Sequence, residues 1–124
     1  MKRPHVIINC AMSADGKIAS PTRKQIRISC DEDIKRMYRL RNECDAVLVG
    51  IGTILSDDPK LTVKELYVRH PKQPLRVILD SNARTPSHAL ALNNAAKTLI
   101  ITAKGKKKPY TQSHVEVVEC DTDS

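Results

Sequence analysis

Residues 45–63, DAVLVGIGTILSDDPKLTV, decide the fold of this chain. The apolar run Ala46–Val49 has the length and composition of a buried strand, and Gly50 ends it. Ile51-Gly52-Thr53 then turns sharply into a segment that the pattern predicts to be a short helix. Pro59 ends this helix, because a proline biases the preceding residue out of the α region. A buried strand that runs directly into a helix indicates an α/β domain.

Four other apolar segments predict further strands around this unit. They cover residues 5–12, 75–79, 98–102 and 114–118. Crossover segments separate them, and one of these, residues 88–96, has a composition that favours a helix. The alternation predicts a single α/β domain over residues 1–124, with a mainly parallel sheet and flanking helices.

A longer helix is predicted from Ser29 onward. Ser29-Cys30-Asp31-Glu32 fits a capping box, in which Ser29 is the N-cap and the Glu carboxylate reaches back to its N–H group. The helix then places one set of residues on a single face: Ile34, Met37, Tyr38 and Arg41. We interpret the apolar members as core. Arg41 either extends its head to water or meets an anionic ligand.

Composition limits the classes of protein. Of the 124 residues, 40% are apolar, which is enough for a core. No apolar run reaches the roughly 18 residues of a membrane span, so we expect a cytoplasmic protein. The four cysteines and four histidines have no metal-site spacing. We therefore expect no metal, and free thiols buried in a reducing compartment.

The net charge of +7 raises nucleic acid as a partner. Four of the positive charges lie together in residues 104–108, beside Gly105 and Pro109, a pattern typical of a solvated loop. Three tyrosines and no Trp or Phe make a poor stacking surface for single strands. A small phosphorylated ligand explains the basic balance as well, and nucleic acid is not the expected partner.

Three turns follow predicted strands: Ser13–Lys17, Gly50–Asp57 and Asp80–Arg84. In open α/β sheets, ligands bind beyond the carboxyl ends of the strands. If the strands are parallel, all three turns meet at one edge and predict a ligand site there. The glycines of Gly50-Ile51-Gly52-Thr53 could let backbone N–H groups approach an anion. This motif alone is weak, and a tight strand-to-helix turn explains it as well.

Three segments carry a family resemblance: SADGKIA at 13–19, the run at 45–63, and RVILDS at 76–81. Together they resemble the reductase domain of riboflavin biosynthesis, a family related in fold to dihydrofolate reductase. The resemblance covers Pro4 to about Thr102 and is closest to the stand-alone archaeal and fungal type, because no deaminase domain or zinc-ligand pattern is present. It implies an NADPH-dependent reductase that converts the ribosylamino group of 2,5-diamino-6-ribosylamino-4(3H)-pyrimidinone 5′-phosphate to ribitylamino.

The resemblance also implies roles for single residues. The positions that meet the cofactor are Ala11, Arg27, Thr53, Asp57, Ser81, Asn82, Ala83 and Arg84. The positions on the substrate side are Gln25, Arg41, Leu61 and Lys64. Lys17 matches a lysine near the reacting ribose, where it would polarise or protonate the sugar oxygen. Arg41 and Lys64 would bind the 5′-phosphate. Lys64 stands where the family usually has Arg, so it keeps the charge without the bidentate fork.

Family members continue beyond the length of this chain. Their second half carries further strands and a Glu-Gly-Gly-Gly type loop around the cofactor phosphates, and this chain has four glycines and no such loop. The expectation is an N-terminal portion of the domain, incomplete at the C-terminus, poorly active alone, and homodimeric as the family tends to be. Two alternatives stay open: a non-catalytic partner or binding subunit, and a dihydrofolate-reductase-like enzyme with another pterin or pyrimidine substrate.

Overall fold

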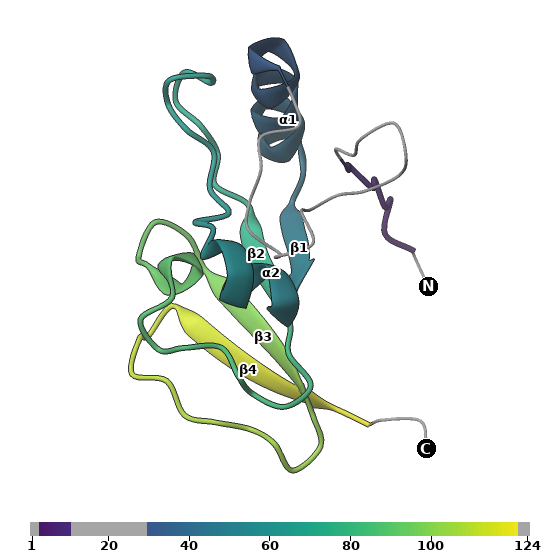
Figure 1. The fold of residues 1–124 in the computed structure, drawn as a ribbon, viewed down its shortest axis with the longest axis vertical. Coiled ribbons are helices and arrows are strands. Elements are labelled where there is room, and N and C mark those ends of the chain that lie inside the picture. Colours follow the sequence, from purple (N-terminus) through teal and green to yellow (C-terminus); the bar gives the residue numbers. More distant parts are fainter. Residues whose placement is uncertain (1–2, 11–29, 122–124) are drawn as a thin grey trace.

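The computed structural model of the chain describes residues 3–10 and 30–121. Figure 1 shows how its helices and strands follow one another. In chain order they are α1 (Asp31–Glu43), β1 (Ala46–Gly50), α2 (Ile51–Asp57), β2 (Leu75–Leu79), the 3-10 turn η1 (Leu90–Leu92), β3 (Thr98–Ala103) and β4 (Val115–Cys120). The predicted strands from residue 46 onward are therefore confirmed, with ends that move by at most two residues.

The four strands form one sheet in the order β1-β2-β3-β4, and all three pairings are parallel. The register aligns one residue from each strand in a row: Val49, Ile78, Ile100 and Val117. Parallel neighbours require crossover connections, which here contain α2 and η1. The predicted α/β class with a mainly parallel sheet is confirmed for the described residues.

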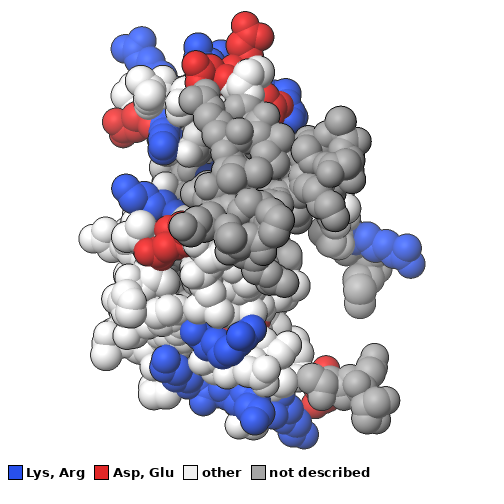
Figure 2. Space-filling view, in the orientation of Figure 1, with Lys and Arg blue, Asp and Glu red and all other residues white. Residues whose placement is uncertain are grey.

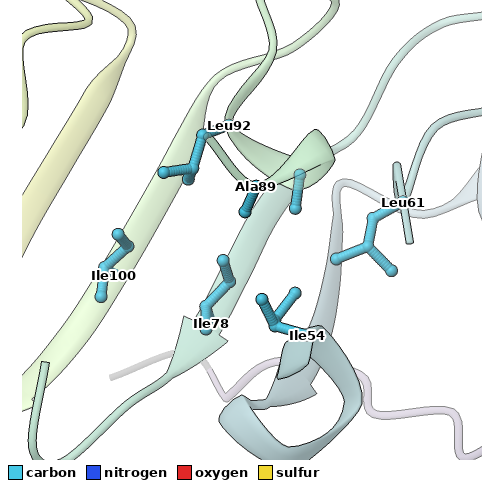
Figure 3. Packing of buried hydrophobic residues seen from close by; sticks show 7 residues of the cluster. Ile54, Leu61, Ile78, Ala89, Leu92 and Ile100 are labelled. Atoms are coloured by element: carbon cyan, nitrogen blue, oxygen red, sulfur yellow. The ribbon is translucent and has the colours of Figure 1, made fainter. Parts of the chain in front are cut away.

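The core lies on one face of this sheet. Ile78 and Ile100 are fully buried there, and Ile54 of α2 is 2% exposed above them. Figure 3 shows these side chains packed together with those of the loops that follow α2 and β2. The remaining residues of the cluster are Leu61 and Ala89 in loops and Ala91 and Leu92 in η1. Each fully buried Ile or Leu contributes about 1.5–3 kcal/mol of hydrophobic stabilisation.

The other face of the sheet is only partly covered. Leu48 is 58% exposed and Leu79 is 44% exposed, so the prediction that β1 is a fully buried strand is wrong. Val47 and Val49 pack on the core, whereas Ala46, Leu48 and Gly50 point to the open face. A parallel strand is buried on both faces only where an element lies over each of them. The helix α1 continues beyond the amino end of β1 instead of covering the sheet (Figure 1).

The helix α1 begins one residue later than predicted. Cys30 is the N-cap, because its carbonyl accepts the first intrahelical bond, from the Ile34 N–H group at 3.0 Å. The N-cap is therefore Cys30 and not Ser29 as predicted, and Cys30 makes no side-chain capping bond. Ser29 itself lies outside the described residues. The predicted face is half-buried, but no residue of α1 is buried, so Ile34 and Met37 are not core residues.

Two local expectations about secondary structure fail, each for its own reason. The described part of the predicted first strand, residues 5–10, is exposed and pairs with no described strand. Residues 88–96 form only η1, since the carbonyls of Asn93 and Ala96 accept bonds from a buried arginine instead of continuing a helix. Leu61, two residues after Pro59, adopts a left-handed φ of 57°, and its side chain is buried in the core.

The prediction that the cysteines are buried is wrong. Cys10, Cys30 and Cys120 are exposed and Cys44 is half-buried.

Arg76 is the largest side chain that is fully buried. Its Nη1 group donates to the Lys60 carbonyl at 3.1 Å and to Asn93 Oδ1 at 2.7 Å. Its Nη2 group donates to the carbonyls of Asn93 and Ala96. Burial lowers the pKa of Arg76 to about 10, so the group stays charged at neutral pH. No carboxylate of the described chain pairs with it, and backbone carbonyls solvate the charge instead.

We expect Arg76→Met to lower the free energy of unfolding by about 2–4 kcal/mol, because it leaves several buried carbonyls without donors. Urea denaturation measures the change. The matched control is Lys97→Met, an exposed cation next to β3, which should change stability by less than about 0.5 kcal/mol. Equal unfolding midpoints for the two variants would contradict this account of Arg76.

Candidate functional site

The carboxyl ends of the strands bring two of the three predicted turns together. Gly50 pairs with Leu79 in the sheet register, so the turns that begin at Gly50 and Asp80 leave neighbouring strands at the same edge. The Ser81 carbonyl also accepts a bond from the Ala103 N–H group of β3 at 3.1 Å. The third turn, Ser13–Lys17, lies outside the described residues.

Asp80 shapes the turn after β2. Its carboxylate is fully buried and accepts three hydrogen bonds, from the Arg84 N–H group at 2.8 Å, the Thr85 N–H group at 2.7 Å and the Thr85 hydroxyl at 2.6 Å. These bonds fold residues 81–84 into a tight loop in which Ala83 has a φ of 54°. The loop leaves Ser81, Asn82 and Arg84 exposed.

A second layer of contacts holds the Asp80 loop in place. The Tyr110 hydroxyl donates to the Thr85 carbonyl at 2.8 Å. Burial raises the pKa of Tyr110, the negative charge of Asp80 raises it further, and its hydrogen bond with Thr85 opposes the shift. The supporting role of Asp80 was not predicted from the sequence. An aspartate directly after a buried strand, with Thr85 five residues on, was the available signal.

The helix α2 carries two of the predicted cofactor residues, Thr53 and Asp57. Both are half-buried, and Asp57 Oδ1 accepts a bond from the Ser56 hydroxyl at 3.1 Å. Asp58 ends the helix in the left-handed region, with a φ of 46°, so Pro59 stops the helix as predicted. Gly50 and Gly52 have no positive φ and no described atom within 4 Å of an added Cβ. Nothing in the backbone therefore requires glycine at these two positions.

Three of the predicted substrate-side residues come together at the other end of β1. Arg41, in the last turn of α1, donates from Nη1 to the Thr62 carbonyl at 2.8 Å. Burial lowers the pKa of Arg41, although Tyr38 opposes the shift. The Lys64 ammonium group lies two residues after Thr62 and is exposed. Leu61, next to Thr62, is buried in the core, which places its side chain away from any ligand at the surface.

Gln73 fixes the backbone next to Lys64. Its amide accepts from the Val63 N–H group at 2.8 Å and donates to the Val63 carbonyl at 3.0 Å. These paired bonds mimic a strand pairing, and they fix the backbone on both sides of Val63.

Four predicted site residues lie outside the described residues: Ala11, Lys17, Gln25 and Arg27. In the described part of the chain no group of three or more His, Cys, Asp or Glu side chains could hold a metal ion. No helix within residues 3–10 and 30–121 is long and apolar enough to cross a membrane. The lysines of residues 104–108 are exposed, as predicted, and Figure 2 shows blue side chains gathered at the lower end of the molecule, where the β3–β4 loop lies.

Known proteins resemble this chain over nearly its whole length. The family model for the RibD C-terminal domain matches residues 4–123. The 2,5-diamino-6-ribosylamino-4(3H)-pyrimidinone 5′-phosphate reductase of Archaeoglobus fulgidus is 50% identical over 109 residues, which are 82% of this chain and 50% of that protein. The protein of the same name from Methanothermobacter thermautotrophicus is 51% identical over 98 residues, 79% of this chain and 45% of that protein. The chain thus spans about half the length of these curated relatives.

A solved structure supports the same grouping. The Thermotoga maritima diaminohydroxyphosphoribosylaminopyrimidine deaminase/5-amino-6-(5-phosphoribosylamino)uracil reductase matches with a TM-score of 0.76 at 31% identity, over 90% of this chain and 31% of that chain. The predicted fold, α/β and dihydrofolate reductase-like, is confirmed by this likeness together with the parallel sheet.

We expect Asp80→Asn to lower the free energy of unfolding by about 2–3 kcal/mol, because an amide nitrogen cannot accept the bonds that one carboxylate oxygen now accepts. Amide hydrogen exchange should accelerate at Arg84 and Thr85 more than at the strand residues. Ser81→Ala, an exposed change in the same loop, is the control and should leave both measurements nearly unchanged. Unchanged exchange at Arg84 and Thr85 in Asp80→Asn would refute the shaping role.

Proposed function

Because the chain belongs to the RibD C-terminal domain family, we propose that it is part of an NADPH-dependent reductase of riboflavin biosynthesis. The proposed reaction reduces the ribosylamino group of 2,5-diamino-6-ribosylamino-4(3H)-pyrimidinone 5′-phosphate to ribitylamino. The observation that carries the proposal is the identity of about one residue in two with two archaeal proteins named for this substrate. Neither alternative, a non-catalytic subunit or an enzyme for another pterin, has comparable support.

The carboxyl edge of the sheet has the donor set that a dinucleotide needs. Ser81 and Asn82 offer exposed polar groups, and Arg84 offers an exposed cation for the 2′-phosphate that distinguishes NADPH from NADH. Thr53 and Asp57 add a hydroxyl and a carboxylate, and a carboxylate suits a ribose hydroxyl. We therefore assign these residues, with Ala83 in the loop and with Ala11 and Arg27 from the family resemblance, to cofactor binding.

The cations at the other end of β1 suit the phosphate of the substrate. Arg41 is oriented by its bond to Thr62, and Lys64 lies on the segment that Gln73 fixes. We assign both to the 5′-phosphate, with Gln25 as a further contact. Leu61 is assigned to the substrate side through its backbone, since its side chain is buried.

Lys17 is the proposed catalytic residue. NADPH supplies a hydride when it is bound. The ammonium group of Lys17 would donate a proton to the ribose ring oxygen, which neutralises the charge that develops there as C1′ is reduced. The proposal thus assigns phosphate binding to Arg41 and Lys64 and proton transfer to Lys17, so these groups would act on different parts of the substrate.

The proposal includes a homodimer in the cytoplasm. The family tendency supports the homodimer, and the partly uncovered apolar face of the sheet, which includes Leu48 and Leu79, is consistent with it. A phosphorylated, water-soluble substrate supports the cytoplasmic location.

We expect Thr53→Ala or Asp57→Ala to weaken NADPH binding by about 1.5–3 kcal/mol, the value of a hydrogen bond that involves a charged group. Binding of the pyrimidine substrate should change far less. Titration followed by nicotinamide fluorescence gives the cofactor affinity. Leu55→Ala, an exposed change in the same helix, is the control. Unchanged NADPH affinity in both variants would remove α2 from the cofactor site.

In a protein that contains the complete reductase domain, we expect Lys17→Met to lower kcat strongly with nearly unchanged NADPH affinity, because the change removes a proton donor and no cofactor contact. The assay follows NADPH oxidation with the named pyrimidinone phosphate as substrate. Lys107→Met, in the exposed lysine loop, controls for loss of one positive charge. Normal turnover by Lys17→Met would return Lys17 to the role of a solvated turn residue. Absence of turnover by the unsubstituted protein together with absence of NADPH binding would argue against the proposed reductase.

A further inference from the structure

Two tyrosines from distant parts of the chain stack on each other beside Arg41. The ring of Tyr38, in α1, lies with its centroid 5.0 Å from that of Tyr67, and the two planes differ by 10°. Both residues are half-buried. Offset stacked pairs of this kind contribute more than their buried area alone. The stack therefore ties the loop after β1 and α2 to the helix before β1.

The same stack gathers two positive charges. The Arg41 guanidinium carbon lies 5.2 Å from the centre of the Tyr38 ring, and the Lys64 ammonium nitrogen lies 5.5 Å from it. Within residues 3–10 and 30–121, neither cation forms an ion pair with a carboxylate. Two like charges next to one ring repel each other unless an anion lies between or beside them. The cluster is thus electrostatically suited to a bound anion.

The backbone links the position of Lys64 to the Tyr67 ring. The N–H groups of Tyr67 and Val68 both donate to the Lys64 carbonyl, at 3.0 and 3.2 Å. This turn fixes Lys64 and Tyr67 relative to each other, while Arg41 is fixed by Thr62 from the same loop. Movement of Tyr67 away from Tyr38 would therefore carry Lys64 away from Arg41.

We infer that Tyr38 and Tyr67 are positioning residues for a phosphomonoester site whose cations are Arg41 and Lys64. The Tyr38 ring contacts both cations, and Tyr67 stacks on that ring. The stack thereby restricts Lys64, whose flexible side chain lacks the preorganised fork of arginine. The inference rests on the proposed function, in that the phosphate is taken to be the 5′-phosphate of the substrate.

The test titrates the purified protein with ribose 5-phosphate, inorganic phosphate and ribose, and follows binding by NMR. The expected result is binding of both phosphates and none of ribose. Tyr67→Ala should bind ribose 5-phosphate about three- to tenfold more weakly, which corresponds to the loss of one aromatic pair. Tyr67→Phe keeps the ring and should restore most of the affinity. Leu66→Ala is the matched control, since Leu66 is 82% exposed in the same turn. Its affinity should equal that of the unsubstituted protein.

The values of KM, kcat and NADPH affinity separate a positioning role from a general loss of structure. In the reductase assay Tyr67→Ala should raise KM for the pyrimidine substrate while kcat and NADPH affinity change little. If Tyr67→Ala does not fold, Tyr67→Leu replaces it, because Leu keeps the apolar bulk without the stack. Tyr67→Ala could lose phosphate affinity while the unsubstituted protein shows no reductase activity. That result would support the inference and count against the proposed function. Normal phosphate affinity in Tyr67→Ala, failure of Tyr67→Phe to restore it, or no phosphate binding by the unsubstituted protein would overturn the inference.

Discussion

A buried positive charge without an acidic partner is the constraint on which the described structure depends. The guanidinium of Arg76 is buried and donates hydrogen bonds to the carbonyls of Lys60, Asn93 and Ala96. These carbonyls belong to the loops that follow α2 and η1. Leaving a buried charge incompletely solvated costs several kcal/mol, so the loops must bring their carbonyls to it. This requirement explains why the only helical turn in residues 88–96 is the 3-10 turn η1, and it accounts for the left-handed φ of Leu61, the residue after Lys60.

A second buried charge, that of Asp80, lies just beyond the carboxyl end of β2. Side chains alternate along a strand, so Arg76, Ile78 and Asp80 share one face as cation, apolar residue and anion. The two charges are about 13 Å apart along the strand, too far for an ion pair. Backbone groups, with Asn93 Oδ1 at Arg76 and the Thr85 hydroxyl at Asp80, bind the two charges separately. Arg76 orders the loops over the core, while Asp80 orders the loop that faces the proposed cofactor. The same strand therefore supports both the fold and the site.

Sequence patterns were sufficient for the parallel sheet but not for the contacts that shape the site. Runs such as Ala46–Val49 report which segments can be strands, because apolar β-branched residues fit a buried sheet. They do not report what covers each face, so the exposure of Leu48 could not be foreseen. The left-handed Leu61 and the role of Asp80 depend on groups 15 or more residues away or on backbone donors. The family resemblance paired Arg41 with Lys64, whereas only the coordinates show that Tyr38 and Tyr67 join them.

The all-parallel topology has a consequence for how the chain folds. No two neighbouring strands can pair until the segment between them has closed into a loop, and closure costs more entropy as that segment lengthens. The segment between β3 and β4, residues 104–114, is shorter than residues 80–97 between β2 and β3, and residues 51–74 between β1 and β2 are the longest. We expect β3 and β4 to nucleate the sheet, with β1 joining last. A high proportion of such distant contacts is also what makes a domain of this size slow to fold.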